Sequence, residues 1–328
     1  MKKKTGSFPQ TLHAAIKYFS DENRAFEFLK HMRWPDGIVK CPTCGSTDVS
    51  FISTRKLWKC KKVHPKQQFS VKVGTVLEDS PIALDKWLCA FWLITNCKNG
   101  ISSYELHRSI GVTQKTAWFM LQRIRLAMQD DGIEKMKGRV EVDETYVGAR
   151  ARFMHKEKRP KGTGMIGKTA VMGLLQRNAP GDKTYSRVRL KVLGTLKRHE
   201  IDPLVRRNVE KGTEVFTDKF HSYNNLADEY VHNVIDHAEC YAIGHVHTNG
   251  LENFWSLLKR ALRGTYVNVE PFHLFRYLDE QAFRFNERKE TDAGRFAKAL
   301  RGIVGKGLRY AKLIGGEGIH CPETWQTT

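Results

Sequence analysis

The chain has 328 residues, of which 41% are hydrophobic, so it is long enough for two or three domains with buried cores. Lys and Arg number 55 against 35 Asp and Glu, which gives a net charge of +20. A surplus of this size is typical of proteins that neutralise nucleic-acid phosphates. There is no run of about 18 apolar residues to span a membrane. No apolar segment follows the basic start either, so we expect a cytoplasmic, nucleoid-associated protein with no membrane partner.

Residues 1–36 are expected to form an N-terminal helical segment. Apolar side chains recur at helical spacing over residues 11–33, on both sides of the polar stretch Ser20-Asp21-Glu22-Asn23. That stretch is typical of a helix cap and first turn. The sequence therefore predicts a pair of helices here.

Three of the seven cysteines cluster within residues 37–78, where we expect a zinc ribbon of short strands and turns. In a reducing compartment such a cluster favours a metal over disulfides. Val63 stands where a second CxxC motif would place a fourth thiolate, and the nearest competent group is His64. The cysteine motif therefore does not fix the identity of the fourth ligand. With His64 in that place, the expected Zn²⁺ ligands are Cys41, Cys44, Cys60 and His64. Four protein ligands leave no position for water, so this zinc would be structural.

Residues 79–131 are predicted to be helical and to contain a helix-turn-helix. Ser102 begins a short helix that ends before Gly111, and Thr113 caps the next helix, which runs through Met128. In this motif the exposed start of the second helix reaches DNA. The expected DNA-contacting residues are Thr113, Gln114 and Lys115. An ordinary three-helix bundle has the same spacing and is the alternative.

Residues 138–290 mix strand and helix patterns, which predicts an α/β domain. The expected strands are 139–147, 169–177, 186–193 and 213–217, and the expected helices are 197–210, 251–263 and 271–287. Residues 149–168 form a basic loop, which is either solvated or in contact with DNA. Residues 291–328 are expected to be a glycine-rich C-terminal tail with one helix at 293–302.

Three carboxylates stand out in this domain. Asp143 lies in one apolar strand, Asp218 ends another, and Glu252 begins an amphipathic helix. Along that helix a polar stripe opposes an apolar stripe, and it places Lys259 two turns from Glu252. This geometry suits a carboxylate that binds a metal ion, Glu252, and a cation that binds a DNA phosphate, Lys259. Asn249, one turn before Glu252, is an alternative ligand, and strand alternation places Glu141 on the same face as Asp143.

With these motifs the chain resembles the bacterial insertion-sequence DDE transposases that carry an N-terminal zinc ribbon. The resemblance covers roughly residues 15–290. The blocks that carry it are Cys41-Pro42-Thr43-Cys44, Val142-Asp143-Glu144-Thr145-Tyr146-Val147-Gly148, Thr217-Asp218, His247-Thr248-Asn249-Gly250-Leu251-Glu252 and Lys259-Arg260. Between Asp218 and Glu252 lie 33 residues, and Lys259 follows seven residues after Glu252, which is the spacing of that family.

The resemblance implies a ribonuclease H-like catalytic domain, with a mixed sheet flanked by helices. Asp143, Asp218 and Glu252 would bind two Mg²⁺ (or Mn²⁺) ions that cut and join double-stranded DNA at the ends of a mobile element. The implied DNA-contacting residues are Lys259, Arg260 and Arg263. The protein would act as a homo-oligomer on DNA. Two alternatives are a ribonuclease H-like nuclease without strand transfer and a DNA-binding regulator with an inert remainder.

Overall fold

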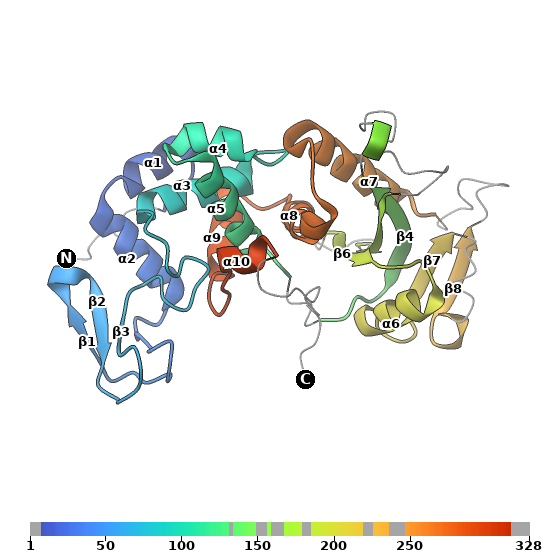
Figure 1. The fold of residues 1–328 in the computed structure, drawn as a ribbon. Helices are drawn as coiled ribbons and strands as arrows, with labels where there is room; N and C mark the ends of the chain where they lie inside the picture. Colours follow the sequence, from blue (N-terminus) through green and yellow to red (C-terminus); the bar gives the residue numbers. More distant parts are fainter. Residues whose placement is uncertain are drawn as a thin grey trace. The chain divides into compact units, whose positions relative to one another are not determined.

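The computed structural model describes residues 8–130, 134–148, 156–158, 167–178, 185–218, 226–235 and 247–315. The chain divides into two compact units (Figure 1). The first unit contains residues 1–129 and 289–328, and the second contains residues 130–288. Within the described residues, no helix is long and apolar enough to cross a membrane.

The core of the first unit is an aromatic cluster from both ends of the chain. Helices α1 (Leu12–Phe19) and α2 (Glu22–Arg33) supply Phe19 and Phe28. Their rings lie 5.7 and 5.9 Å from Phe296 of α9 (Asp292–Arg301). Residues from 289 onward therefore belong to the first unit, whereas the sequence analysis treated residues 291–328 as a separate tail.

A small antiparallel sheet follows α2 in the first unit. Its strands are β1 (Val49–Ile52), β2 (Leu57–Cys60) and β3 (Gln68–Phe69), with β2 in the middle. Trp58 of β2 stacks on Phe26 of α2 at 5.6 Å and on Phe69 at 5.9 Å. Because these rings are buried, one side of the small sheet is fixed against α2.

Three helices follow, close to the predicted limits: α3 (Leu84–Asn96), α4 (Ser103–Ile110) and α5 (Gln114–Ala127). Ser102 and Glu105 form a capping box at the start of α4. Gly111 ends α4 in the left-handed conformation, with φ of 62°, which glycine adopts without strain. Thr113 Oγ1 accepts a hydrogen bond from the Thr116 amide and caps α5. Two helices joined by a tight turn are thus present, an arrangement that the helix-turn-helix and the ordinary three-helix bundle share.

The second unit contains a five-stranded mixed sheet in the order β6-β5-β4-β7-β8. Neighbours β6, β5 and β4 are antiparallel, and β7 and β8 run parallel to β4. The strands are β4 (Arg139–Val147), β5 (Thr169–Gln176), β6 (Arg187–Leu193), β7 (Glu214–Asp218) and β8 (Val231–Ile235). The strands expected from the sequence did not include β8.

Helices cover both faces of this sheet. Helix α6 (Arg198–Asn208) shares one buried cluster with Val140 and Val142 of β4. Helices α7 (Asn249–Ala261) and α8 (Leu274–Asn286) share a second cluster, built on Val171 and Leu175 of β5. Because side chains alternate along a strand, β4 buries Val140 and Val142 towards α6 and turns Glu141 and Asp143 towards α7. This is the expected ribonuclease H-like α/β architecture.

Candidate active site and metal centres

Helix α7 approaches the sheet closely where β5 has a glycine. Gly173 pairs with Asp143 across the β4–β5 ladder. A Cβ atom at Gly173 would lie 2.6 Å from the Trp255 ring and 2.9 Å from Leu251, so no larger residue fits there. At this distance Trp255 Nε1 donates a hydrogen bond of 2.8 Å to Asp143 Oδ2. The indole thus ties α7 to the strand that carries Asp143.

A second tie holds the start of α7. Glu141, only 1% exposed, accepts a 2.8 Å hydrogen bond from the Leu251 amide through Oε2. Its Oε1 pairs with Arg177 Nε at 2.6 Å, and the Arg177 Nη2 atom also donates to the His247 carbonyl. A carboxylate at a helix start satisfies an amide that the helix leaves without a partner and favours the helix dipole. The sequence analysis recognised the face of Glu141 but not this role, and Arg177 was missed.

Asp218 joins Asp143 through the parallel pairing of β7 with β4. The last registered pair is Glu141 with Phe216. Asp143 and Asp218 each follow that pair by two residues. Their side chains therefore lie on the same face of the sheet, at neighbouring positions towards the carboxyl ends of the two strands. Asp218 is the last residue of β7.

The negative charges of Asp218 and Glu252 both act on the carboxyl group of Asp143. The pKa of Asp143 is raised from its ordinary value to about 6, mainly by burial, with smaller contributions in the same direction from the negative charges of Asp218 and Glu252. Hydrogen bonds from Trp255 and the Glu144 amide act in the opposite direction. Carboxylates that repel one another in a partly buried site provide the oxygen ligands that Mg²⁺ and Mn²⁺ prefer. The donor set therefore fits divalent cations.

Glu252 lies on the exposed side of α7, in its first turn. Asn249, the alternative ligand, is the first residue of the same helix and brings no charge to Asp143. Within the described residues, only the four zinc-type ligands discussed below have ligand atoms all within 4.8 Å of one another.

Cations gather beside the acidic cluster. Burial lowers the pKa of Lys259, the positive charges of Arg263 and Lys168 lower it further, and Asp143 raises it. Arg263, Lys168 and Asp143 are thus close enough to Lys259 for their charges to act on it. Arg260 and Arg263 are exposed on the last turns of the α7 segment. An acidic centre flanked by cations matches a phosphodiester held between metal ions and basic side chains.

The small sheet carries the predicted metal ligands. The ligand atoms of Cys41, Cys44, Cys60 and His64 all lie within 4.8 Å of one another. Cys41 Sγ is 3.4 Å from His64 Nε2, and Cys44 Sγ is 3.6 Å from Cys60 Sγ. His64 is thus in place as the fourth member. The set of three thiols and one imidazole is typical of closed structural zinc sites.

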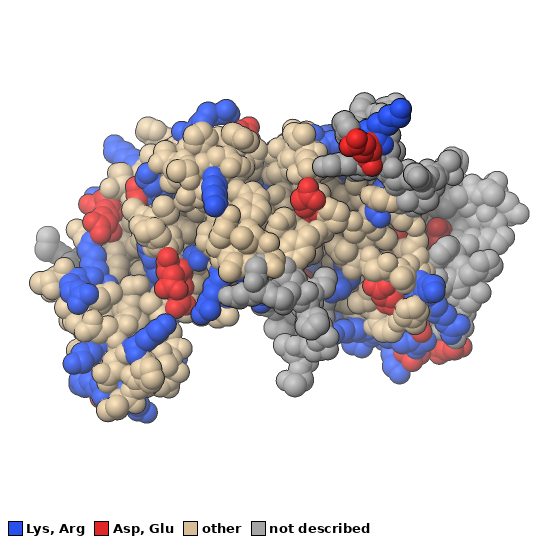
Figure 2. Space-filling model, in the orientation of Figure 1, with Lys and Arg blue, Asp and Glu red and all other residues tan. Residues whose placement is uncertain are grey.

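Local hydrogen bonds prepare these ligands for a cation. His64 Nδ1 lies 2.7 Å from the Pro65 carbonyl, which leaves Nε2 directed at the cysteines. Burial raises the pKa of Cys41, but backbone hydrogen bonds from Cys44 and Thr43, with side-chain hydrogen bonds from Cys44 and Cys60, together outweigh that effect and bring the pKa to about 7. A thiolate is the form that binds metal. Around this centre, Figure 2 shows Lys and Arg side chains over the β1–β3 sheet.

The predicted DNA-contacting residues of α5 differ in their surroundings. Thr113 and Lys115 are exposed. Gln114 is partly buried, and its side-chain amide donates a 2.8 Å hydrogen bond to Ser103 Oγ of α4. Gln114 therefore helps to fix α5 against α4, while its two neighbours face solvent. The basic loop 149–168 lies outside the described residues, except for 156–158 and 167–168.

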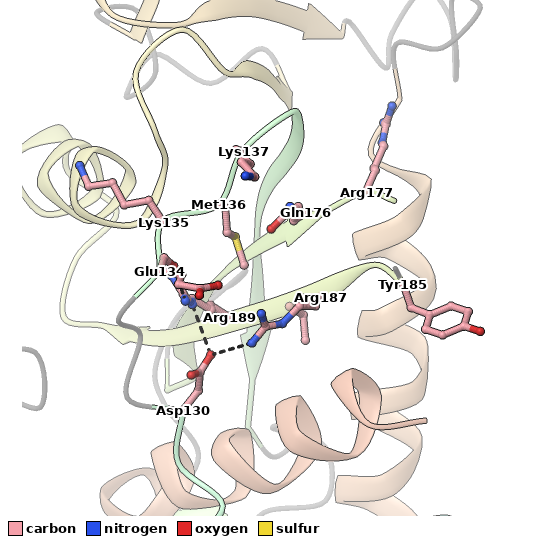
Figure 3. A pocket seen from close by; sticks show the side chains of 11 residues that line it. Asp130, Glu134, Lys135, Met136, Lys137, Gln176, Arg177, Tyr185, Arg187 and Arg189 are labelled. Atoms are coloured by element: carbon pink, nitrogen blue, oxygen red, sulfur yellow. Dashed lines mark hydrogen bonds and ion pairs between the residues drawn. The ribbon is translucent and has the colours of Figure 1, made fainter. Parts of the chain in front are cut away.

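A cavity of about 220 Å³ lies beside the ends of β4, β5 and β6 (Figure 3). Its arginines are held by protein groups. Arg187 and Arg189 converge on Asp130, at 3.9 and 3.4 Å, and Arg189 also donates to the Glu134 carbonyl. Lys135 extends away from them, towards the Arg206 carbonyl. These contacts anchor the start of the second unit to β6, so the cavity is best explained as part of the scaffold.

Comparison with known proteins agrees with this architecture. Residues 135–286 match the family model of the ISXO2-like transposase domain, and residues 20–62 match the transposase zinc-ribbon domain. The chain is 28% identical to a protein in transposable element ISH50 of Halobacterium salinarum, over 310 residues that cover 88% of this chain and 98% of that protein. It is also 36% identical to a transposase-like protein of Haemophilus influenzae over 85 residues. These residues cover 26% of this chain and 68% of that protein.

The zinc-ribbon sheet and the ribonuclease H-like sheet, with the family models that match them, define a DDE-type transposase. Within that class the two matched models together span more than half of the chain. The chain belongs to the ISXO2-like family of insertion-sequence transposases with an N-terminal zinc ribbon.

Proposed function

We propose that the protein cuts DNA at the ends of an insertion sequence and joins them to a target. The observation that carries this proposal is the placement of Asp143 and Asp218 on neighbouring parallel strands, with the helix that carries Glu252 hydrogen-bonded to Asp143 through Trp255. Three clustered carboxylates have little use in a DNA-binding regulator, because they repel phosphates. They suit a site in which cations bridge protein and DNA.

The roles of the side chains follow from their positions. Asp143, Asp218 and Glu252 would bind two Mg²⁺ or Mn²⁺ ions. When bound, these ions would activate the attacking water or 3′-hydroxyl and stabilise the leaving oxygen of an in-line displacement. Trp255 and Glu141 would keep the metal-binding side of α7 at a fixed distance from β4. Lys259, with Arg260 and Arg263, would hold a phosphate beside the scissile bond.

Closed coordination by Cys41, Cys44, Cys60 and His64 would make the zinc site structural, with one Zn²⁺ per chain. The net charge of +20 supports double-stranded DNA as the partner. Joining two element ends to one target needs at least two active sites, so we expect a homo-oligomer on DNA.

The test combines purified protein, Mg²⁺ and a duplex carrying an element end, and scores nicked and joined products. Asp143→Ala, Asp218→Ala and Glu252→Ala should each lower cleavage at least about 10³-fold while duplex binding persists. Glu144→Ala is the matched control, since this acid follows Asp143 on the other face of β4, and it should retain activity. Cleavage without joining would favour a nuclease. Binding without cleavage in any divalent metal would favour a regulator.

A further inference from the structure

The C-terminal segment returns to the helix-turn-helix. After α9, residues 303–315 continue within the first unit and form the short helix α10 (Tyr310–Leu313). Leu308 and Leu313 are 5% and 3% exposed, so this segment is anchored by buried side chains. Its place beside α5 had no counterpart in the sequence analysis.

The contacts follow one stripe of α5. Arg123 Nε donates a 3.1 Å hydrogen bond to the Leu308 carbonyl. One turn earlier, the Phe119 ring meets the Tyr310 ring edge-on at 5.5 Å. One turn earlier again, Lys115 Nζ lies over the Tyr310 ring at 4.8 Å. These α5 residues are spaced by four, so the segment runs along the helix and reaches its first turn.

That first turn is the end of α5 that a helix-turn-helix presents to the DNA groove. Arg309 and Lys312, which flank this contact, are exposed. In the part of the chain that the structure describes, their side chains make no ion pair or hydrogen bond. They are three residues apart, so they lie on one side of the turn. Lys115 lies over the ring of Tyr310, which stands between Arg309 and Lys312 in the sequence. Together the three residues bring three cations to the first turn of α5.

Two acidic residues lie near the other end of this stripe. Glu78 and Asp79 act on the charge of Arg123, two turns from Lys115. The Glu78 carboxylate also accepts a hydrogen bond from the Gly74 amide. The start of α5 therefore combines a positive helix end with unneutralised cations, a combination that attracts phosphate.

We propose that Arg309 and Lys312 form part of the DNA-binding surface and contact duplex phosphates beside the groove that receives α5. The proposal rests on the proposed function in that it takes duplex DNA as the ligand. It assigns to the C-terminal segment a positioning role, since phosphate contacts fix register without reading sequence. Tyr310 is the residue that aligns this segment with Lys115.

The test measures binding of the full-length protein to an element-end duplex across a KCl series, by fluorescence anisotropy. The double variant Arg309→Ala/Lys312→Ala should weaken binding by about 10-fold at 0.1 M salt. It should reduce the slope of log K against log salt by about two, or one for each lost phosphate contact. Both side chains are exposed, so thermal unfolding should be unchanged.

The matched control is Lys17→Ala/Arg24→Ala, which removes the same charge from exposed positions on α1 and α2. The control should keep the wild-type slope. A double variant with the wild-type slope and affinity would overturn the inference, and so would an equal loss in the control. Cleavage is scored on the same samples. If the slope falls but the wild type does not cut with Mg²⁺, the inference stands and the proposed function fails.

Discussion

Trp255 Nε1 donates a 2.8 Å hydrogen bond to Asp143 Oδ2, and so a buried indole supports one of the three acidic residues directly. The other oxygen of Asp143 accepts from the Glu144 amide at 2.8 Å. Each oxygen keeps a further lone pair, so both stay able to bind a cation. The helix that carries Glu252 is thus hydrogen-bonded to the carboxylate with which Glu252 would share the metal.

Trp255→Phe should shift the acid limb of the pH–cleavage profile to higher pH. The Trp255 hydrogen bond lowers the pKa of Asp143, so its loss leaves that carboxyl protonated to a higher pH. The check is a cleavage profile at fixed Mg²⁺. Phe254→Leu is the control, because it also reduces a buried aromatic residue of α7 but donates nothing to Asp143. An acid limb that moves equally in both variants would contradict the role of the hydrogen bond.

Glu141→Gln should destabilise the second unit by about 1–3 kcal/mol, because it weakens a buried ion pair and the cap of α7 together. The measurement is the free energy of unfolding by urea, with the Mg²⁺ concentration that gives half-maximal cleavage as a second readout. That concentration should rise as α7 loosens. Glu214→Gln is the control, since its pair with Arg139 spans β7 and β4 but is 38% and 41% exposed. It should lose less than about 0.5 kcal/mol. Equal losses of unfolding free energy in the two variants would contradict the role of Glu141 as the buried partner of Arg177 and the cap of α7.

Stabilisation by Mn²⁺ should grow from pH 5 to pH 7.5. The folded-state pKa of Asp143, about 6, is above its ordinary value of 3.8. Its contribution to stability is therefore present below about pH 4 and is lost as the pH rises through 6. A bound cation favours the charged form and offsets that loss. The check is the increase in Tm on adding Mn²⁺ at each pH, with Asp143→Asn as the control. An increase that does not depend on pH in the wild type would contradict this prediction.

Cys44→Ser should lower the zinc content from one ion per chain and reduce the Tm of the first unit. Loss of one of four ligands opens a closed site, and binding energy at such a site is folding energy. Metal analysis and thermal unfolding check this. Cys89→Ser, a change at a half-buried thiol of α3, should leave the zinc content intact. Native protein without zinc would refute the site.

Local sequence patterns predicted much of this structure. The alternation over residues 139–147 matches β4 at both ends, because one face packs on α6 and the other carries acids. His64 was predicted because no other ligand type lies near Cys60. The acidic triad was singled out from its positions in two strands and at a helix start, and a family resemblance with its spacing then supported it. Its convergence depends on parallel pairing of β4 with β7, which no local pattern shows.

Long-range contacts were the part that the sequence did not reveal. The ion pair of Glu141 with Arg177 joins residues 36 apart, and neither has a local motif. The docking of Phe296 into the first unit joins opposite ends of the chain. Strand β8 was missed because it is short and contains His232 and Asn233. Such features depend on which surfaces meet, and periodicity reports only which side of an element is apolar.

The central claim is that Asp143, Asp218 and Glu252 share a pair of divalent cations. The most direct measurement is anomalous X-ray scattering from crystals of the protein soaked in Mn²⁺. We predict two manganese peaks about 4 Å apart, each within about 2.3 Å of an oxygen from at least one of these carboxylates. Crystals with no manganese at these residues, or with their oxygens more than about 10 Å apart, a gap that two ions about 4 Å apart cannot bridge, would contradict the account.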